Sequence, residues 1–301
     1  MLSDIHGNLP ALEAVIDDAS RAGVSRFLIA GDLFSGVPFP LEVYHCLQAL
    51  NAVIIKGNGE QYLIDYFRGD CPPLMRTARQ WAPVRWAVEQ VGGEVMDWTC
   101  GLPEQVVVTT DGLPEIRMVH GSPAKINDGL IPDADPEVLG LFRSARLLAK
   151  DQNPPPLAER LRSVTEGVLI CGHLHIPWQQ RLESLLAFCP GAVGISNTGD
   201  WRASYALLRG GAGCWQVEHR RVAYDRERVY QAYADSGLLE CGGPFVRALL
   251  GNVKTGKNTG WQYVLHAQEI ARSRGEEWQP IFSNETARLA EATFPWAEYD
   301  V

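Results

Sequence analysis

Five short motifs in the sequence place carboxylate, amide and imidazole side chains beside glycine or at alternate positions. In chain order, the residues of these motifs that could bind a metal are Asp4, His6, Asp32, Asn58, His120, His173 and His175. Oxygen and imidazole donors together suit Mn²⁺, Fe or Zn²⁺, and they suit neither Ca²⁺ nor a thiolate site. Four of the seven histidines of the chain belong to this set. These residue types predict a centre for two metal ions.

The spacing of the donors favours one shared site. Asp4 and His6 are two residues apart, as are His173 and His175, and alternate side chains of an extended segment lie on the same side. Asp32 follows the next expected strand and could bridge two ions. A single motif of this kind is usually a turn or a buried structural histidine, but five in order are difficult to explain in that way. The neighbouring glycines would let the backbone approach each ligand closely.

The elements expected in the first part of the chain bring the first three motifs to one edge of a sheet. Apolar periodicity predicts helices over residues 9–22 and 40–50, and short buried strands over residues 26–30 and 52–56. This alternation indicates parallel strands with helices outside the sheet. The motifs then follow the strand ends, where open α/β sheets place their sites.

Strands dominate the middle of the chain and helices dominate its end. We expect strands over residues 105–110, 114–119, 167–171, 185–189, 203–208 and 214–224. Further helices are expected over residues 60–99, 226–235, 244–250, 258–274 and 283–293, with a linker over residues 251–260. The expected fold class is α/β, as a four-layer α-β-β-α sandwich of two stacked mixed sheets flanked by helices. Residues 1–224 would form this domain, and residues 225–301 a C-terminal helical extension packed on it.

The composition limits the class of protein. With 301 residues, 46% of them hydrophobic, the chain can bury a large core. A net charge of −9 argues against a broad nucleic-acid surface, and no apolar run is long enough to span a membrane. Seven cysteines without a CxxC pair indicate reduced thiols. We therefore expect a cytoplasmic protein with a small-molecule substrate and no membrane partner.

At this point the motifs resemble those of a known family. The segments SDIHGN, GD, GN, H and GHLH are similar to the pattern of the calcineurin-like metallophosphoesterases, over about residues 1–224. The stretch CPGAVG at 189–194, followed by RASYALL, is similar to the small prokaryotic, phosphodiesterase-like branch. The resemblance implies two stacked sheets flanked by helices, with two metal ions at one edge.

The resemblance also implies which residues serve each ion. One ion would be bound by Asp4, His6, Asp32 and His175. The other would be bound by Asp32, Asn58, His120 and His173, so that Asp32 is shared. Asp32, Asn58 and His120 would also act in catalysis. Mn²⁺ is the first choice of metal, with Fe, Zn²⁺ and Ni²⁺ as alternatives.

The expected reaction is hydrolysis of a phosphodiester or a nucleotide-like phosphoester. Two ions would polarise the phosphoryl oxygens and generate a bridging hydroxide that attacks phosphorus in line. A phosphomonoesterase is the alternative within this class. A non-catalytic scaffold on the same fold is an alternative of another class, but such scaffolds tend to lose ligands and all seven are present. A DNA-repair nuclease fits poorly with the net charge.

One departure from the family concerns the leaving group. The third motif commonly reads GNHE or GNHD, and its histidine protonates the leaving group, whereas this chain has Gly57-Asn58-Gly59-Glu60. General acid catalysis contributes roughly 10²–10⁴-fold, so its loss favours substrates with good leaving groups. We expect Gly59→His to help alkyl phosphoesters selectively, unless the backbone at Gly59 needs a positive φ.

The two ends of the chain carry further expectations. Only three residues precede Asp4, so we expect the native chain to begin upstream with a short apolar strand. Asn8 would hold the loop of the first motif. The helical extension would pack through an apolar face that includes Trp261 and would take no part in the chemistry. A homo-oligomer contact is the second choice and a lid over the metal cleft is the third.

Overall fold

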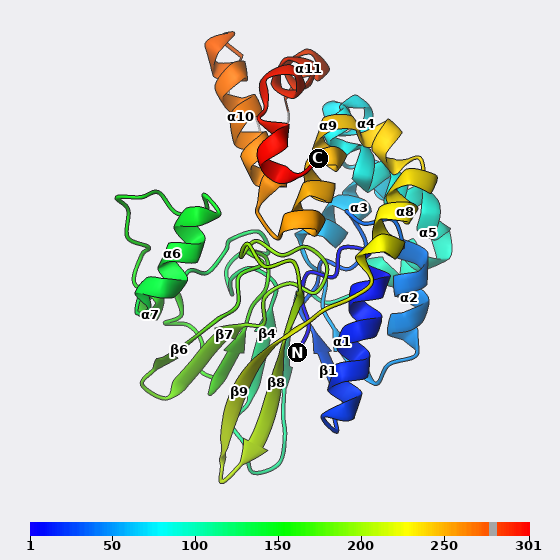
Figure 1. The fold of residues 1–301 in the computed structure, drawn as a ribbon. Helices are drawn as coiled ribbons and strands as arrows, with labels where there is room; N and C mark the ends of the chain where they lie inside the picture. The colour runs from blue at the N-terminus through cyan, green and yellow to red at the C-terminus, as the bar shows by residue number, and fades with distance from the viewer. Residues whose placement is uncertain (277–281) are drawn as a thin grey trace.

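The computed structural model describes residues 1–276 and 282–301 (Figure 1). Its first part alternates helices and short strands, in the order α1 (Leu9–Arg21), β1 (Phe27–Ile29), α2 (Pro40–Gln48), β2 (Ala52–Ile54) and α3 (Asn58–Arg68). Proline stands in the first turn of α1 and α2, where its missing N–H costs nothing because first-turn amides have no partner within the helix. Strands β1 and β2 pair in parallel, as expected from the alternation.

Three further helical segments follow within the stretch expected to be helical over residues 60–99. They are α4 (Pro73–Thr77), the 3₁₀ helix η1 (Arg79–Trp81) and α5 (Ala82–Cys100). The stretch is mostly helical, as expected, but it is interrupted because Gly69 ends α3 in the left-handed conformation and Pro72 and Pro73 begin the next turn. Gly92 has non-helical angles and kinks α5.

A five-stranded mixed sheet lies in the middle of the chain. Its order is β3 (Gln105–Val108), β4 (Ile116–Val119), β5 (Val168–Ile170), β7 (Leu185–Cys189) and β6 (Trp178–Leu182). The three inner strands run parallel, and β3 and β6 pair antiparallel at the edges. Strand β6 and the short helices α6 (Pro136–Ser144) and α7 (Leu157–Arg160) were not predicted. The sequence of β6 is mostly polar, because alternate side chains of this edge strand are exposed.

The N-terminal residues join the remaining strands into a second layer. The N–H of Leu2 donates to the carbonyl of Leu28 in β1 at 2.9 Å. On the other side, Met1 exchanges both backbone hydrogen bonds with Ala206, at 2.8 and 3.1 Å. Ala206 belongs to the hairpin of β8 (Ala203–Gly211) and β9 (Cys214–Val222). Asp4 therefore follows a segment that is paired on both sides.

Buried side chains fill the spaces between these layers. One cluster contains Leu28 and Ala206 together with Met118 and Phe188, so it joins both sheets. A larger cluster joins the other side of the N-terminal layer to α1, α2, α3 and α5, and a third joins the five-stranded sheet to α6 and α7. In Figure 1 the two groups of helices lie on opposite sides of the strands. The expected α/β class, with mixed sheets and helices, is confirmed.

The C-terminal part is helical. Its elements are α8 (Arg226–Asp235), α9 (Leu238–Thr255), α10 (Thr259–Ser273), α11 (Asn284–Thr293) and the 3₁₀ helix η2 (Trp296–Tyr299). Buried residues of α8 and α9 belong to the large cluster around α1 and α5, whereas α10, α11 and η2 form a second cluster that also contains Ala248 of α9. The domain boundary at residue 224 stays a prediction.

Two expectations for this part are wrong. The first half of the expected linker is helical, because α9 continues to Thr255 and only residues 256–258 separate it from α10. Trp261 is 40% exposed, although its indole N–H donates to the carbonyl of Arg146, so this side chain is not part of a buried face. Among the described residues, no helix is long and apolar enough to cross a bilayer.

Candidate metal centre

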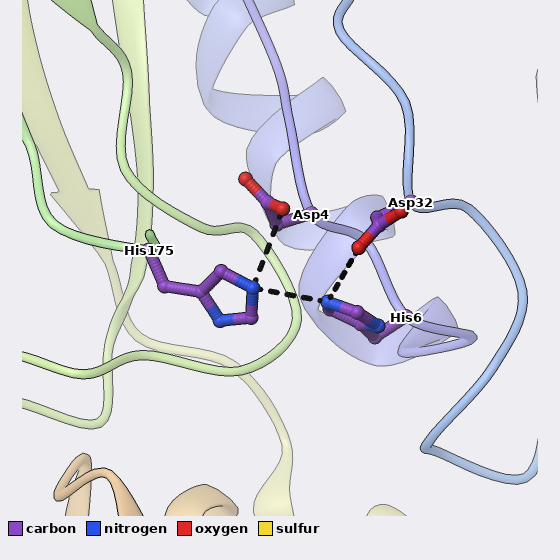
Figure 2. Close-up of side chains that lie close together, drawn as sticks. All are labelled: Asp4, His6, Asp32 and His175. Atoms are coloured by element: carbon purple, nitrogen blue, oxygen red, sulfur yellow. Dashed lines mark hydrogen bonds and ion pairs between the residues drawn. The ribbon is translucent and has the colours of Figure 1, made fainter. Parts of the chain in front are cut away.

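Four side chains from three separate segments meet beyond the end of β1 (Figure 2). Asp4, His6, Asp32 and His175 each offer one ligand atom, and these atoms lie within 4.8 Å of one another. The Nε2 atoms of His6 and His175 are 3.1 Å apart. Nε2 of His175 lies 3.3 Å from Asp4 Oδ1, and Nε2 of His6 lies 3.6 Å from Asp32 Oδ2. Both carboxylates are buried, which is unfavourable unless positive charge is close to them.

Asp32 turns its second carboxylate oxygen toward another set of donors. Asp32 Oδ1 lies 3.4 Å from Nε2 of His120, and the same nitrogen lies 2.9 Å from Asn58 Oδ1. The ring of His173 packs edge-on against that of His120, with 5.3 Å between ring centroids, and its backbone N–H donates to Asp4. The structure thus gathers all seven predicted residues around Asp32. Their roles as ligands stay a prediction.

Backbone carbonyls orient three of the four histidines. In each of them Nδ1–H donates to a carbonyl, which leaves the Nε2 lone pair facing the carboxylates. The pairs are His6 with Ser35 at 2.7 Å, His120 with Ala30 at 2.7 Å, and His175 with Ile195 at 2.6 Å. A cation could therefore be bound by these Nε2 atoms without any rotation of the rings.

The backbone at the site is left-handed rather than extended. Five of the seven residues have a positive φ, namely Asp4 at 55°, His6 at 51°, Asp32 at 55°, His173 at 74° and His175 at 59°. The expectation that alternate residues of an extended strand carry the ligands is therefore wrong, because these residues lie in turns beyond the strand ends. Such conformations cost about 1–3 kcal/mol each and concentrate at functional sites.

Glu60 is a buried carboxylate whose role the motifs do not reveal. It accepts backbone N–H bonds from Asp32 at 2.8 Å, Leu33 at 2.7 Å and Gly57 at 2.8 Å, so it ties the ends of β1 and β2 together. Burial and the charge of Asp32 raise the pKa of Glu60 to about 7. The only signal in the sequence is the capping-box spacing from Gly57 to Glu60 at the start of α3.

Burial and charge separate the histidines into two groups. Burial lowers the pKa of His6, and burial together with the charge of His120 lowers the pKa of His173 to about 4. Burial also acts to lower the pKa of His120, but the charge and hydrogen bond of Asp32 outweigh it and raise that pKa to about 10. Since a metal ligand must be deprotonated, a cation would compete with a proton at His120.

Gly59 occupies the position at which the resemblance noted in the sequence implies a histidine. Its N–H donates to Asp32 Oδ1 at 2.6 Å, and its φ is not positive. A Cβ at this position would lie 2.9 Å from Asp32 Oδ1 and 3.3 Å from Asp32 Cγ. Gly59 does not need a positive φ, so backbone strain does not oppose Gly59→His. The substitution is opposed instead by the lack of space beside Asp32.

Asn8 holds the loop of the first motif, as predicted. Its Nδ2 donates to the carbonyl of Gly194 at 2.8 Å, and its Oδ1 accepts the N–H of Ala11 at 3.2 Å and caps α1. The N–H of Gly194 in turn donates to the carbonyl of Asp4 at 2.9 Å. The stretch over residues 189–194 therefore supports the first motif directly.

Comparison with known proteins identifies the family. The sequence profile of the calcineurin-like phosphoesterase superfamily domain matches residues 1–209. The chain belongs to this superfamily. The predicted resemblance is thereby confirmed, and members of the calcineurin-like superfamily depend on divalent metals.

Several relatives match most of the chain. An uncharacterized protein of Methanocaldococcus jannaschii is 24% identical over 247 residues, which are 80% of this chain and 93% of the relative. The crystal structure of a hypothetical protein from Pyrococcus horikoshii OT3 has a TM-score of 0.63 at 22% identity and covers 85% of this chain and 96% of its own. That of a metallophosphoesterase from Sphaerobacter thermophilus has a TM-score of 0.62 at 24% identity and covers 85% and 98%. Both structures share the fold of this protein.

The donors at the site fit a divalent cation of the kind that the calcineurin-like superfamily uses. Two buried carboxylates face the Nε2 atoms of three histidines whose rings are already oriented. Carboxylate and imidazole together suit Mn²⁺, Fe and Zn²⁺, and they do not distinguish among these metals.

Proposed function

We propose that this protein hydrolyses phosphodiester or nucleotide-like phosphoester bonds with the help of two divalent metal ions. The observation that carries the proposal is the position of Asp32, whose carboxylate oxygens lie 3.6 Å from His6 Nε2 and 3.4 Å from His120 Nε2. Each oxygen faces its own set of donors. One set is Asp4, His6 and His175, and the other is Asn58, His120 and His173. A carboxylate between two donor sets is the common ligand that a pair of ions requires.

The chain's own residues prepare the site for this chemistry. Bound divalent cations supply polarisation of the phosphoryl oxygens and activation of water near neutral pH. The backbone carbonyls keep Nε2 of His6, His120 and His175 aimed at the carboxylates, and the N–H of Gly59 fixes Asp32. Because these groups are already in place, they need little reorganisation during the reaction, which favours stabilisation of the transition state.

The leaving group distinguishes this chain from relatives with a GNH motif. Gly59 offers no acid, and Asp32 lies too close for a larger side chain to enter without displacement. We therefore expect turnover to depend strongly on the leaving group, with aryl phosphoesters hydrolysed faster than alkyl ones. The preference for diesters over monoesters rests on the family resemblance.

The proposal is tested with the purified full chain, loaded separately with Mn²⁺, Zn²⁺ and Fe²⁺. Metal content is measured by mass spectrometry, and turnover is measured on bis-para-nitrophenyl phosphate, para-nitrophenyl phosphate, and cyclic and dinucleoside phosphates. We expect two equivalents of metal per chain and faster turnover of diesters. Faster turnover of the monoester would favour a phosphomonoesterase, and bound metal without turnover would favour a scaffold. A chain that binds no metal would contradict the proposal.

A further inference from the structure

Two buried side chains of the C-terminal helices reach the loops that orient the candidate centre. Tyr233 in α8 and Asn252 in α9 are only 1% and 2% exposed. Each makes a hydrogen bond to a residue that lies more than 50 positions earlier in the chain. Each of the two loops that they contact also supplies the carbonyl that fixes one histidine ring.

Tyr233 reaches the loop that follows Asp32. Its hydroxyl donates to the carbonyl of Gly36 at 2.7 Å. The preceding residue is Ser35, whose carbonyl accepts Nδ1–H of His6 at 2.7 Å. The tyrosine hydroxyl therefore holds the peptide next to the one that orients the His6 ring.

Asn252 reaches the loop that follows β7, through a second amide side chain. Its Nδ2 donates to Asn197 Oδ1 at 3.0 Å and lies 3.5 Å from the carbonyl of Ser196. Nδ2 of Asn197 donates in turn to the carbonyl of Leu174 at 3.3 Å, between the two histidines of the fifth motif. This relay connects α9 to the backbone that carries those histidines.

The same loop is tied to the C-terminal helices at another point. The N–H of Gly199 donates to the carbonyl of Gly256, just after α9, at 2.8 Å. Ile195, near the start of this loop, accepts Nδ1–H of His175 at 2.6 Å. The C-terminal helices thus hold the loop that orients His175 at positions 196, 197 and 199.

The two loops also contact each other beside His6. Gly36 has a φ of +131°, and a Cβ built there would lie 3.1 Å from Ile195 Cδ1 and 3.5 Å from His6 Cβ. Gly36 therefore lies at a close junction of both loops and one histidine. A shift of either loop would change the spacing of the two imidazoles.

We infer that Tyr233 and Asn252 are positioning residues. They hold Nε2 of His6 and Nε2 of His175 at their separation of 3.1 Å and thereby set the metal affinity of the centre. The inference rests on the proposed function in that it requires the centre to bind metal. It assigns to the C-terminal helices a role at the site in addition to their packing in the core.

The test uses the metal-free full chain titrated with Mn²⁺ alone, with calorimetry as the readout of affinity. Tyr233→Phe removes its contact and a single oxygen atom, whereas Asn252→Ala also removes the acceptor of the Gly260 N–H bond at 2.7 Å. Tyr263→Phe is the matched control for the first, because its buried hydroxyl donates to Ala287 within the C-terminal cluster, at 2.9 Å. Asn258→Ala is the control for the second, because its buried amide donates to Ala145 at 3.2 Å.

Loss of a residue that is hydrogen-bonded directly to a metal ligand lowers metal affinity by about 10–100-fold. Tyr233 and Asn252 lie one hydrogen bond further from the ligands. We therefore expect each variant to lower the affinity for one Mn²⁺ by about three- to tenfold. The controls should bind Mn²⁺ as the wild type does, although their melting temperatures fall by a similar amount. A parallel Co²⁺ titration should show an altered visible spectrum only for Tyr233→Phe and Asn252→Ala.

Two outcomes would overturn the inference and are distinguishable from failure of the proposed function. If the wild type binds Mn²⁺ and both variants bind it equally well, the positioning role is wrong while the proposed function stands. If the controls weaken binding as much as the variants, the effect is one of stability alone. A wild type that binds no metal ion would overturn both proposals.

Discussion

Asp32 is the residue on which the candidate centre depends most. Its two oxygens face His6 and His120, and one of them accepts the N–H of Gly59 at 2.6 Å. We predict that Asp32→Asn lowers metal-dependent turnover by at least about 10²-fold and lowers bound metal, because the amide keeps the shape but loses the charge and one acceptor. Turnover and metal content measured on the same preparation check this. Asp18→Asn, in the last turn of α1, is the control and should retain both ions.

Gly59 permits a second prediction about the same carboxylate. An added Cβ would lie 2.9 Å from Asp32 Oδ1, so we predict that Gly59→Ala weakens Mn²⁺ binding by about tenfold and that Gly59→His weakens it further instead of supplying an acid. Calorimetric titration measures both. Gly140→Ala in α6, where a Cβ meets nothing within 4 Å, is the control and should leave metal affinity unchanged. Wild-type affinity in Gly59→Ala would show that Asp32 can move without cost.

Single residues differ in how far the sequence reveals their role. The seven donors could be named because few residue types bind metals and their order along the chain is distinctive. Their backbone could not be predicted, since left-handed turns and an extended strand both bring residues Asp4 and His6 near one another. Glu60 could not be assigned because it acts on backbone N–H groups, which every residue other than proline carries.

At the scale of elements, the hairpin of β8 and β9 makes a polar contact with the other sheet. His219 of β9 lies with Nε2 2.8 Å from the carbonyl of Cys189 in β7. Burial, with a contribution from Arg221, lowers the pKa of His219. Below the unfolded value of about 6.5, the unfolded chain therefore binds more protons than the folded one, and stability falls as the pH falls.

The predicted consequence is a pH dependence that one substitution reduces. Between pH 7 and pH 5 the wild type should lose more of its free energy of unfolding than His219→Gln, which retains an N–H donor but does not titrate. Urea unfolding at several pH values measures the difference. If the free energy of unfolding falls equally with pH in the wild type and in His219→Gln, the contact between His219 and Cys189 does not distinguish neutral from protonated histidine.

The cluster of α10, α11 and η2 allows a prediction in which stability falls but metal affinity does not change. Phe294 is buried there, with its ring 5.5 Å from that of Tyr263 and 4.7 Å from that of Trp296. We predict that Phe294→Ala destabilises these elements by about 3–5 kcal/mol and leaves Mn²⁺ affinity unchanged, because Tyr233 and Asn252 lie outside the cluster. Hydrogen exchange and metal titration check the two parts, and a fall in affinity would contradict the separation.

The elements themselves could be predicted where periodicity is strong. The expected helix over residues 9–22 agrees with α1 within one residue, because one face of it is apolar. Strand β6 could not be predicted, since only its pairing with β7 at the sheet edge gives its polar residues a strand conformation. The helix expected over residues 244–250 is the second part of α9, which is flanked by the left-handed residues Gly237 and Gly256.

For the whole molecule, metal should contribute measurably to stability, because segments distant in the sequence converge on the centre. A ligand at a hundred times its dissociation constant stabilises the folded state by about 2.7 kcal/mol. For a cooperative unit of about this size, that corresponds to a rise in melting temperature of roughly 4–6 °C. Thermal unfolding in Mn²⁺ and in chelator measures this. Asp32→Asn should show a smaller rise, and identical melting temperatures for the wild type would contradict metal binding.

Hydrogen bonds between residues far apart in the chain could not be predicted from the sequence. Tyr233 and Gly36 are 197 residues apart, and Met1 and Ala206 are 205 apart, so no local pattern records either hydrogen bond. The expectation that the C-terminal helices take no part in the chemistry followed from their lack of donor motifs. A positioning role carried by a hydroxyl and an amide leaves no such motif.

The left-handed turns also restrict how the centre could change during evolution or redesign. At φ values near 55°, as at Asp4, His6 and Asp32, the residues that occur readily are glycine, asparagine, aspartate and histidine. A single exchange to cysteine or glutamate would meet a conformational penalty before any metal chemistry was altered. Conversion into a thiolate site that prefers softer metals would thus require rebuilt loops as well as new side chains. The left-handed turns therefore favour oxygen and imidazole donors at this metal centre.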